Sequence, residues 1–291
     1  MDGLSDKSAI EVVPSGKPLG AEIKGIDVTK VDAAQFTGIR QALHDHQVIL
    51  FRNQDIDEPR FLEFARFFGE IDMPRKTRID NDPWIPEYPE IIVISNLKDD
   101  AGKAMGALGA GEAFWHADMT YLDEVPLASL LYALEIPDQG GGTGFSNQCM
   151  AFENMPNELL SRIAGRELVH DHVHNSTGAV TPNWEEQESP LETPGAHHPI
   201  VVRHQATGRK HLMLGRRPHA LITGMEIEES EALLDELWAH ATQEKFVWRH
   251  DWKTGDLIIW DNWCTLHHRN PFDESQRRIM HRTQIKGVIP S

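Results

Sequence analysis

Short apolar runs recur along the chain, and their length and spacing predict β-strands. Between these runs, three segments have apolar residues at helical spacing. The first is 33–46, the second opens with Pro59 and runs to Phe67, and the third is 226–242. Many strands with few helices favour a β-sandwich or jelly roll over an alternating parallel α/β fold. The predicted strands span residues 48–52, 91–95, 129–136, 200–204, 211–214, 246–250 and 257–261.

Two stretches between the predicted elements are too long and irregular to be simple connections. Residues 97–113 are rich in glycine and alanine, and residues 175–199 carry several prolines and glutamates. Loops of this length are commonly lids over a binding site, although plain surface loops are an alternative. We expect residues 1–291 to form a single domain with lid loops at 97–113 and 175–199, because nothing in the pattern requires a second domain.

Composition and charge exclude several classes of function. The chain is 40% hydrophobic and 25% charged, which is typical of a globular protein with a sizeable core. Residues 1–7 include charged side chains and lack a signal-peptide core, and no run approaches a membrane span, so we expect a cytoplasmic protein. The net charge of −17 disfavours nucleic-acid and membrane partners. An anionic substrate would therefore need a local positive pocket.

The two cysteines, Cys149 and Cys264, have neither metal-ligand nor redox spacing. Free cysteine is among the most buried residue types, so we expect two buried thiols.

The first candidate for chemistry is the motif Phe114-Trp115-His116-Ala117-Asp118. On a strand, residues two apart point the same way, so His116 and Asp118 could hold one metal ion together. A His-x-Asp pair is too short to be diagnostic alone, and a further ligand is required.

A further ligand is available in the segment 260–269, where His267 and His268 follow Trp260-Asp261-Asn262. Two imidazoles and one carboxylate on one face of an octahedron leave three positions open, which suits iron(II) oxygenases. A structural zinc site would instead close a tetrahedron. The residues alone leave His267 and His268 as alternatives.

A third group of candidates lies in Gln276-Arg277-Arg278-Ile279-Met280-His281-Arg282. On a strand, Arg278 and Arg282 would share one face. Guanidinium groups bind carboxylates bidentately, so two inward arginines could receive two organic acids. The alternative is a cationic surface strand paired with acidic side chains.

Taken together and in this order, these motifs resemble the family of taurine and 2,4-dichlorophenoxyacetate dioxygenases. The resemblance covers roughly residues 10 to 287, and its specificity lies in the joint order and spacing of the motifs. The residues that carry it are Leu19-Gly20-Ala21-Glu22-Ile23, Gly25-Ile26-Asp27, Phe68-Gly69-Glu70, His116-x-Asp118, Gly140-Gly141-Gly142-Thr143, Trp260-Asp261-Asn262 with His267, and Arg277 to Arg282.

The resemblance implies a mainly β protein with flanking helices around a double-stranded β-helix, a cupin-like jelly-roll core. It further implies Fe(II) as cofactor, with 2-oxoglutarate and O2 as co-substrates. Oxidative decarboxylation of 2-oxoglutarate to succinate and CO2 would then drive hydroxylation of a small organic acid, such as an aryloxyalkanoate, another carboxylate or a sulfonate. Hydroxylation beside a heteroatom would also cleave the substrate. The implied iron ligands are His116, Asp118 and His267; Thr143 and Arg278 would bind 2-oxoglutarate, and Arg282 would bind the acid group of the substrate.

Taurine itself is not the expected substrate, because the family's taurine enzyme has a histidine shortly after Phe-Gly-Glu where this chain reads 71–76 without one. Four apolar residues predict a less polar substrate pocket: Met105, Leu108, Phe114 and Met119. Four cations either add positive charge at the pocket mouth or lie on the surface: Lys98, Lys103, Arg216 and Arg217.

His170, His172 and His174 lie at period two and could hold a second metal ion, although a polar strand end near the cavity mouth is favoured. Two other functions compete with the dioxygenase. One is a non-catalytic metal-binding jelly-roll sensor or binding protein, and the other is a zinc hydrolase, which would have no use for paired inward arginines. An iron halogenase is disfavoured by Asp118, since halide needs that coordination position. From the resemblance we also expect a homo-oligomer, a dimer or a tetramer.

Overall fold

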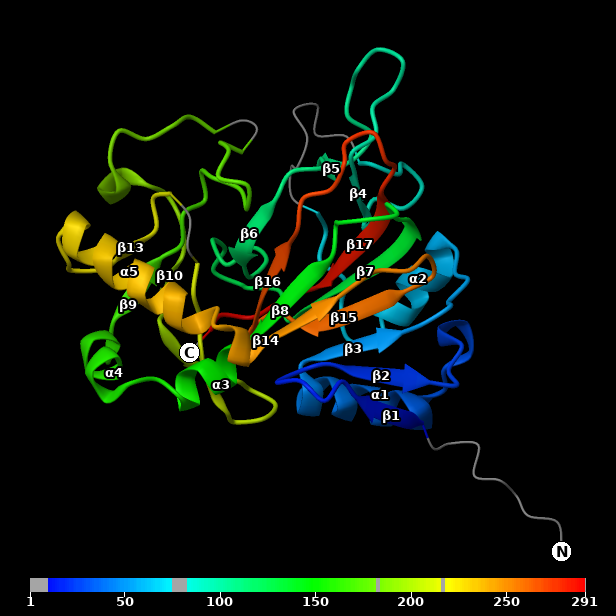
Figure 1. The fold of residues 1–291 in the computed structure, drawn as a ribbon, viewed down its shortest axis with the longest axis horizontal. Coiled ribbons are helices and arrows are strands. Elements are labelled where there is room, and N and C mark those ends of the chain that lie inside the picture. Colours follow the sequence, from blue (N-terminus) through cyan, green and yellow to red (C-terminus); the bar gives the residue numbers. More distant parts are fainter. Residues whose placement is uncertain (1–9, 75–82, 182–183, 216–217, 291) are drawn as a thin grey trace, which may run out of the picture.

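The computed structural model describes residues 10–74, 83–181, 184–215 and 218–290. The larger of its two main sheets has eight strands in the order β1-β2-β3-β15-β7-β17-β4-β5 (Figure 1). These strands are β1 (Glu11–Pro14), β2 (Ala21–Lys24), β3 (Val48–Phe51), β4 (Ile92–Ser95), β5 (Ala107–Leu108), β7 (Ala128–Glu135), β15 (Leu257–Asp261) and β17 (Ile279–Ile285).

The smaller sheet has the order β14-β8-β16-β6, and all its pairings are antiparallel. Its strands are β6 (Ala113–His116), β8 (Thr143–Asn147), β14 (Val247–His250) and β16 (Thr265–Arg269). A buried apolar cluster joins the two sheets, with Phe145 contributed by the smaller sheet and Trp260 and Met280 by the larger.

The alternation of side chains on β15 shows how the larger sheet is covered on both faces. Ile258 and Trp260 belong to the cluster between the sheets, whereas Leu257 and Ile259 belong to a second cluster on the outer face. Because both faces are covered, this strand is apolar almost throughout, which is why periodicity alone does not separate it from a helix.

Two helices cover the outer face of the larger sheet. They are α1 (Ala33–His46), which has a capping box at Asp32, and α2 (Glu58–Ala65), which begins after Asp57 with proline in its first turn. A short 3-10 helix, η1 (Val28–Lys30), precedes α1. The helix α2 ends at Ala65, so the predicted continuation to Phe67 is wrong.

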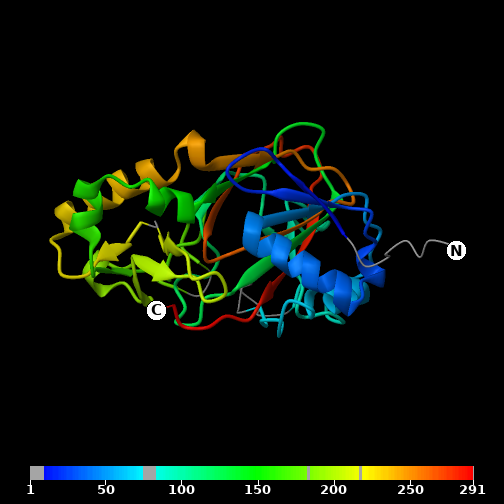
Figure 2. The ribbon, with the colours of Figure 1, turned by 90° about the horizontal axis from the view of Figure 1, so that it is seen from below.

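An insert between the strands of the smaller sheet covers that sheet's outer face. It packs a third cluster, including Leu159, Leu233 and Leu266, and lies at the opposite end of the molecule from α1 and α2 (Figure 2). The insert contains α3 (Gln148–Glu153), α4 (Asn157–Ile163), β9 (Glu167–Val169), η2 (Pro190–Glu192), β10 (His197–Pro199), β11 (Val201–Arg203), β12 (Lys210–Leu212), β13 (Leu221–Ile222), α5 (Ile227–Ala241) and η3 (Glu244–Phe246).

Each of the seven predicted strands coincides with an observed strand to within a residue or two at either end. The two irregular stretches contain more structure than predicted. Residues 97–113 include β5 and the first residue of β6, and residues 175–199 include η2 and β10. Both cysteines are free and buried, as predicted. Within the described residues, no helix is long and apolar enough to cross a membrane.

Candidate metal centre

Three side chains with metal-binding atoms converge between the two sheets. His116 at the end of β6 lies directly opposite His267 on β16, with ring centroids 4.1 Å apart. Oδ1 of Asp118 lies 3.7 Å from Nε2 of His116 and 3.8 Å from Nε2 of His267. All three residues are buried. The structure thus brings the predicted ligand set together from two segments, the end of β6 with the turn that follows it, and β16.

Asp118 does not lie on the strand that the His-x-Asp spacing suggested, because β6 ends at His116. The side chain of Asn262 holds it in place: Oδ1 of Asn262 accepts the N–H of Asp118 at 2.8 Å, and Nδ2 donates to the Asp118 carbonyl at 2.9 Å. The hydroxyl of Ser129 donates to Oδ2 of Asp118 at 2.8 Å. The sequence pattern included Asn262 only as part of the Trp260-Asp261-Asn262 motif and predicted no role for it or for Ser129.

The orientation of His116 also suits metal binding. Its Nδ1 lies 2.6 Å from the carbonyl oxygen of Phe114, which can only accept a hydrogen bond, so Nδ1 carries the proton and Nε2 is left to face Asp118. His268, the alternative ligand, points elsewhere: its Nε2 is 2.7 Å from Oε1 of Glu112 and its ring stacks on Trp115.

The protonation states of two of these groups favour a cation. Burial opposes ionisation of Asp118, but the positive charge of Arg282, helped by the two histidines and the hydrogen bond from Ser129, holds the pKa of the carboxyl well below its usual range. Burial lowers the pKa of His267 to about 4. At neutral pH, Asp118 is therefore a carboxylate and His267 a neutral imidazole, the forms that bind metal ions.

Arg282 on β17 lies beside this group, and its Nη1 donates to Oδ1 of Asp118 at 3.1 Å. Its Nε is buried with no hydrogen-bond partner among the described residues. The arginine therefore has spare donors next to the candidate metal centre.

Arg278 is more deeply enclosed. It is 2% exposed, and its Nε and Nη1 have no hydrogen-bond partner in the part of the chain that the structure describes. Burial, together with the charge of Arg269, lowers the pKa of its guanidinium to about 9. A Cβ placed on Gly141 would lie 3.5 Å from Nε of Arg278, so the glycine motif passes directly beside this group. A buried cation without an acid partner is costly unless an anion joins it.

Thr143 follows the glycine motif as the first residue of β8, and it is buried. Its Oγ1 accepts a hydrogen bond from Nε1 of Trp252 at 2.9 Å. This bond fixes the position of the oxygen and leaves the hydroxyl hydrogen to be donated elsewhere.

The residues predicted to form an apolar pocket have different environments. Met119 is buried and has a left-handed backbone with φ 53°, whereas Met105 and Phe114 are 53% and 52% exposed. Leu108 is half-buried, and Lys98 and Lys103 are exposed. Arg216 and Arg217 lie outside the described residues. Phe114 lines the cavity described below, and the predicted apolar substrate pocket stays a prediction.

A cavity of about 340 Å³ opens beside the candidate metal centre. Its wall includes His116, Trp115 and His268, but neither Asp118 nor His267. Trp115 and His268 alternate with His116 and His267 along β6 and β16, and Glu231 and Trp238 of α5 also line the cavity, so it lies on the outer side of the smaller sheet.

Comparison with known proteins decides the family. Residues 11–284 match the taurine catabolism dioxygenase TauD, TfdA family. The chain belongs to this family. It is 29% identical to the (S)-phenoxypropionate/alpha-ketoglutarate-dioxygenase of Sphingobium herbicidovorans over 96% of both chains. It is 31% identical to the alpha-ketoglutarate-dependent 2,4-dichlorophenoxyacetate dioxygenase of a Burkholderia species, over 87% of this chain and 86% of that protein.

Solved structures agree with this membership of the TauD, TfdA family. The structure of AAD-2 in complex with Mn(II) and N-oxalylglycine has a TM-score of 0.77 and 26% identity, covering 97% of this chain and 99% of that one. The predicted jelly-roll class is confirmed, as are an oxidoreductase of the 2-oxoglutarate-dependent dioxygenase class and its requirement for Fe(II), 2-oxoglutarate and O2. The comparisons support this enzyme class over a non-catalytic sensor.

Proposed function

We propose that the chain hydroxylates a small organic acid of the aryloxyalkanoate type, with His116, Asp118 and His267 as iron ligands. The observation that carries the proposal is the buried guanidinium of Arg278, which has donors without partners in the interior that also holds these three side chains. Such an arrangement needs an anion, and 2-oxoglutarate is the anion that the family requires.

The three proposed ligands fit Fe(II) on their own chemistry. They supply two neutral imidazole nitrogens and one carboxylate oxygen, all within 4.8 Å of one another and all buried. Iron bound there with 2-oxoglutarate and O2 would supply the oxidant for a substrate C–H bond. The hydrogen bonds from His116 to Phe114 and from Asn262 to Asp118 hold two ligands in place before the ion arrives.

Arg278 and Thr143 are the proposed binding groups for 2-oxoglutarate. The planar guanidinium can donate two parallel hydrogen bonds to the distal carboxylate. The hydroxyl of Thr143, whose oxygen is fixed by Trp252, can donate a further one. The glycine beside Arg278 leaves this side of the guanidinium free of a side chain, since a Cβ at Gly141 would lie in contact with Nε at 3.5 Å.

Arg282 is the proposed binding group for the acid group of the substrate. Its contact with Asp118 places it next to the iron ligands, and its buried Nε offers a further donor. An acid bound there would hold the rest of the substrate near the reacting centre, so that one C–H bond is presented repeatedly. Met119, buried beside Asp118, would line the apolar side of the same pocket.

The aryloxyalkanoate class is supported by the substrates named for two relatives, phenoxypropionate and 2,4-dichlorophenoxyacetate. These molecules combine a carboxylate with an apolar ring, which matches an arginine and a methionine at one site. Hydroxylation of the carbon next to the ether oxygen would give a hemiacetal that breaks down to a phenol and a keto acid.

The test measures O2 uptake with Fe(II) and 2-oxoglutarate across aryloxyalkanoates, sulfate esters, sulfonates and short carboxylates, with phenol and succinate quantified together. We expect aryloxyalkanoates to stimulate uptake, with phenol and succinate formed in about equal amounts. Stimulation by sulfate esters or sulfonates alone would reject the proposed substrate class.

We further propose a cytoplasmic homo-oligomer, a dimer or a tetramer. Light scattering after size exclusion measures the oligomeric state, and fractionation of cells measures the location. A monomer, or enzyme recovered outside the cytoplasm, would contradict these proposals.

A further inference from the structure

Among the residues that the structure describes, two groups of candidate metal ligands lie outside the proposed iron site. One consists of His44, His204 and Asp261, and the other of His174, Glu186 and His219. Each places nitrogen and carboxylate oxygen atoms within 4.8 Å of one another. The two groups differ in which ring nitrogen of each histidine carries the proton, because hydrogen bonds to neighbouring residues determine this.

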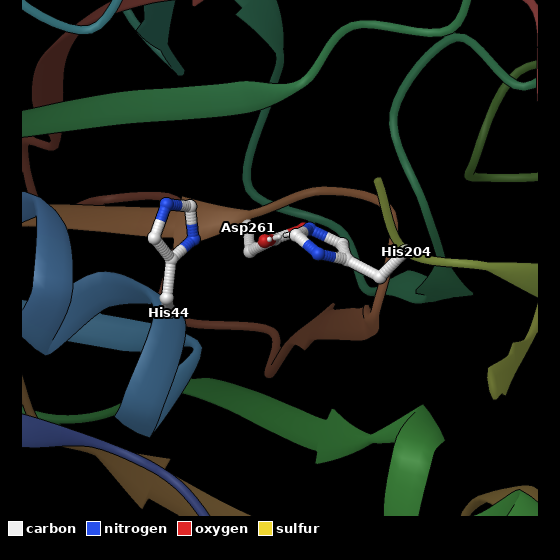
Figure 3. A group of neighbouring side chains, drawn as sticks. All are labelled: His44, His204 and Asp261. Atoms are coloured by element: carbon white, nitrogen blue, oxygen red, sulfur yellow. Dashed lines mark ion pairs between the residues drawn. The ribbon is translucent and has the colours of Figure 1, made fainter. Parts of the chain in front are cut away.

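The first group is a hydrogen-bonded pair with a third residue beside it. His44 and His204 lie on opposite sides of Asp261, and Nε2 of His204 is 2.8 Å from Oδ2 of Asp261 (Figure 3). The backbone N–H of Thr207 donates to Nδ1 of His204 at 3.1 Å, so the proton of the ring lies on Nε2. That nitrogen donates to Asp261 and has no lone pair for a metal ion.

The second group shows the opposite arrangement. Nδ1 of His174 lies 2.6 Å from Oδ2 of Asp171, a fully buried carboxylate that also accepts the backbone N–H of His219. An ionised carboxylate only accepts hydrogen bonds, so Nδ1 of His174 carries a proton. Its Nε2 then faces both carboxylate oxygens of Glu186, at 3.0 and 3.1 Å. Two acceptors this close repel each other unless a cation or a second proton lies between them.

The second imidazole of this group is oriented in the same way. Nδ1 of His219 lies 3.0 Å from Oγ1 of Thr193, and its Nε2 lies 3.6 Å from Oε1 of Glu186. The separations of 3.0 and 3.6 Å bracket the value of about 3.4 Å that joins two ligands placed about 2.1 Å from a tetrahedral zinc ion. A carboxylate such as Asp171 behind His174 is the outer partner typical of metal-bound imidazoles, and the hydroxyl of Thr193 can accept a hydrogen bond from Nδ1 of His219 in the same way.

We propose that His174, Glu186 and His219 bind a divalent metal ion of the zinc class. Two nitrogens and one oxygen supply three tetrahedral positions, and a water molecule completes the fourth, since Glu186 is exposed to solvent on its outer side. His170 and His172 take no part: His172 stacks on Tyr121 and packs at a tilt against Trp184, and His170 lies against His198.

The ion would join three segments of the insert, two of which border the cavity beside the iron site. Asn175 and Pro218, the chain neighbours of His174 and His219, form part of the wall of that cavity. The carbonyl of Ser176 accepts the N–H of Phe114, whose own carbonyl accepts the hydrogen bond from His116. The zinc-class ion therefore fixes the wall that supports a proposed iron ligand. The stretch between β9 and β10, drawn in yellow-green, lies at the upper left of Figure 1.

The test is a calorimetric titration in which Zn²⁺ alone is added to chelator-treated protein. The wild type should bind about two equivalents, one at the iron site and one at the second site. Glu186→Gln should bind about one, with affinity at the second site at least about tenfold weaker. Glu185→Gln is the matched control, because Glu185 is the exposed neighbouring glutamate, and it should behave as wild type.

A second comparison isolates the second site from the proposed function. In the Asp118→Ala background the iron site is impaired, so the remaining equivalent of Zn²⁺ reports the second site, and adding Glu186→Gln should remove it. Co²⁺ in Asp118→Ala should give the strong visible absorption of tetrahedral coordination, which Glu186→Gln abolishes. Equal binding of Zn²⁺ with and without Glu186→Gln in both backgrounds would overturn the site and would leave His174 as a protonated bridge between two carboxylates.

Discussion

Arg277 and Arg278 are neighbours in sequence with opposite surroundings, and they provide a controlled test of the 2-oxoglutarate site. Arg277 is exposed and forms an ion pair with Glu135, whereas Arg278 is buried without an acid partner among the described residues. We predict that Arg278→Gln weakens 2-oxoglutarate binding strongly and that Arg277→Gln does not.

The magnitude follows from the burial of the charge. Removing one partner of a desolvated, charge-assisted pair costs about 2–5 kcal/mol, which corresponds to a rise in Kd of about 30-fold to 5,000-fold. An exposed ion pair contributes about 0–1 kcal/mol to stability, and Arg277 lies outside the proposed site, so the control should change the Kd less than about twofold.

The same burial predicts that replacing Arg278 weakens ligand binding but increases the stability of the ligand-free protein. The fall of the pKa of Arg278 from its usual range to about 9 corresponds to a cost on the order of 5 kcal/mol for keeping the charged form in place. Without ligand, Arg278→Met should therefore raise the free energy of unfolding by about 1–4 kcal/mol, as other replacements of buried charges by apolar residues do. Denaturant titration measures this change.

The binding assay is an anaerobic titration of the Fe(II) protein with 2-oxoglutarate, followed by the visible charge-transfer band. A normal Kd in Arg278→Gln, or equal losses in both arginine variants, would refute the assignment of Arg278. A stability gain in Arg278→Met together with a normal Kd for 2-oxoglutarate would show that the buried charge of Arg278 destabilises the protein without contributing to binding.

Four further predictions concern single side chains. His267→Ala should lose Fe(II) binding, measured by metal analysis after gel filtration, while His268→Ala retains it; the reverse result would exchange the two roles. Thr143→Ala should raise the Kd for 2-oxoglutarate about fivefold, as the loss of one hydrogen bond worth about 1 kcal/mol does, and an unchanged Kd would remove it from the site. Arg282→Gln should raise KM for the organic acid and make succinate in excess of product, because the acid is held less firmly; full coupling would contradict its role. Burial lowers the pKa of His211 from 6.5 to about 4, so the unfolded chain binds the proton first as pH falls, and about 3 kcal/mol of stability is lost between about pH 6.5 and 4. His211→Leu should therefore lose less stability over that range in denaturant titrations. An equal loss in His211→Leu and wild type would refute the lowered pKa.

The sequence predicts the elements whose patterns are strong and local. The helices α1 and α5 agree closely because their apolar stripes extend over several turns. The short helices α3 and α4 were missed, since six or seven residues give too few turns for a helical period to be distinguished. The strand β8 was missed because its buried residues, Thr-Gly-Phe-Ser-Asn, are mostly polar or lack a side chain.

The candidate site was predictable in its residue types and only partly in its geometry. The order of the motifs identifies His116, Asp118 and His267, which the fold brings together. The turn that carries Asp118 and the hydrogen bonds of Asn262 could not be predicted, because they depend on contacts between distant segments. The pairing of His174 with Glu186 and His219 was likewise hidden, since no short spacing joins these three positions.

The hydrogen bonds between Asn262 and the backbone of Asp118 have a consequence for the synthesis of the protein. They join positions 144 residues apart, and contacts of such separation form only after a large loop has closed. A chain emerging from the ribosome therefore carries His116 and Asp118 long before Asn262 and His267 can hold them in register. Iron would be acquired only after His267 has been synthesised, and a chain cut short within the insert would retain, of the three proposed ligands, only His116 and an unanchored Asp118.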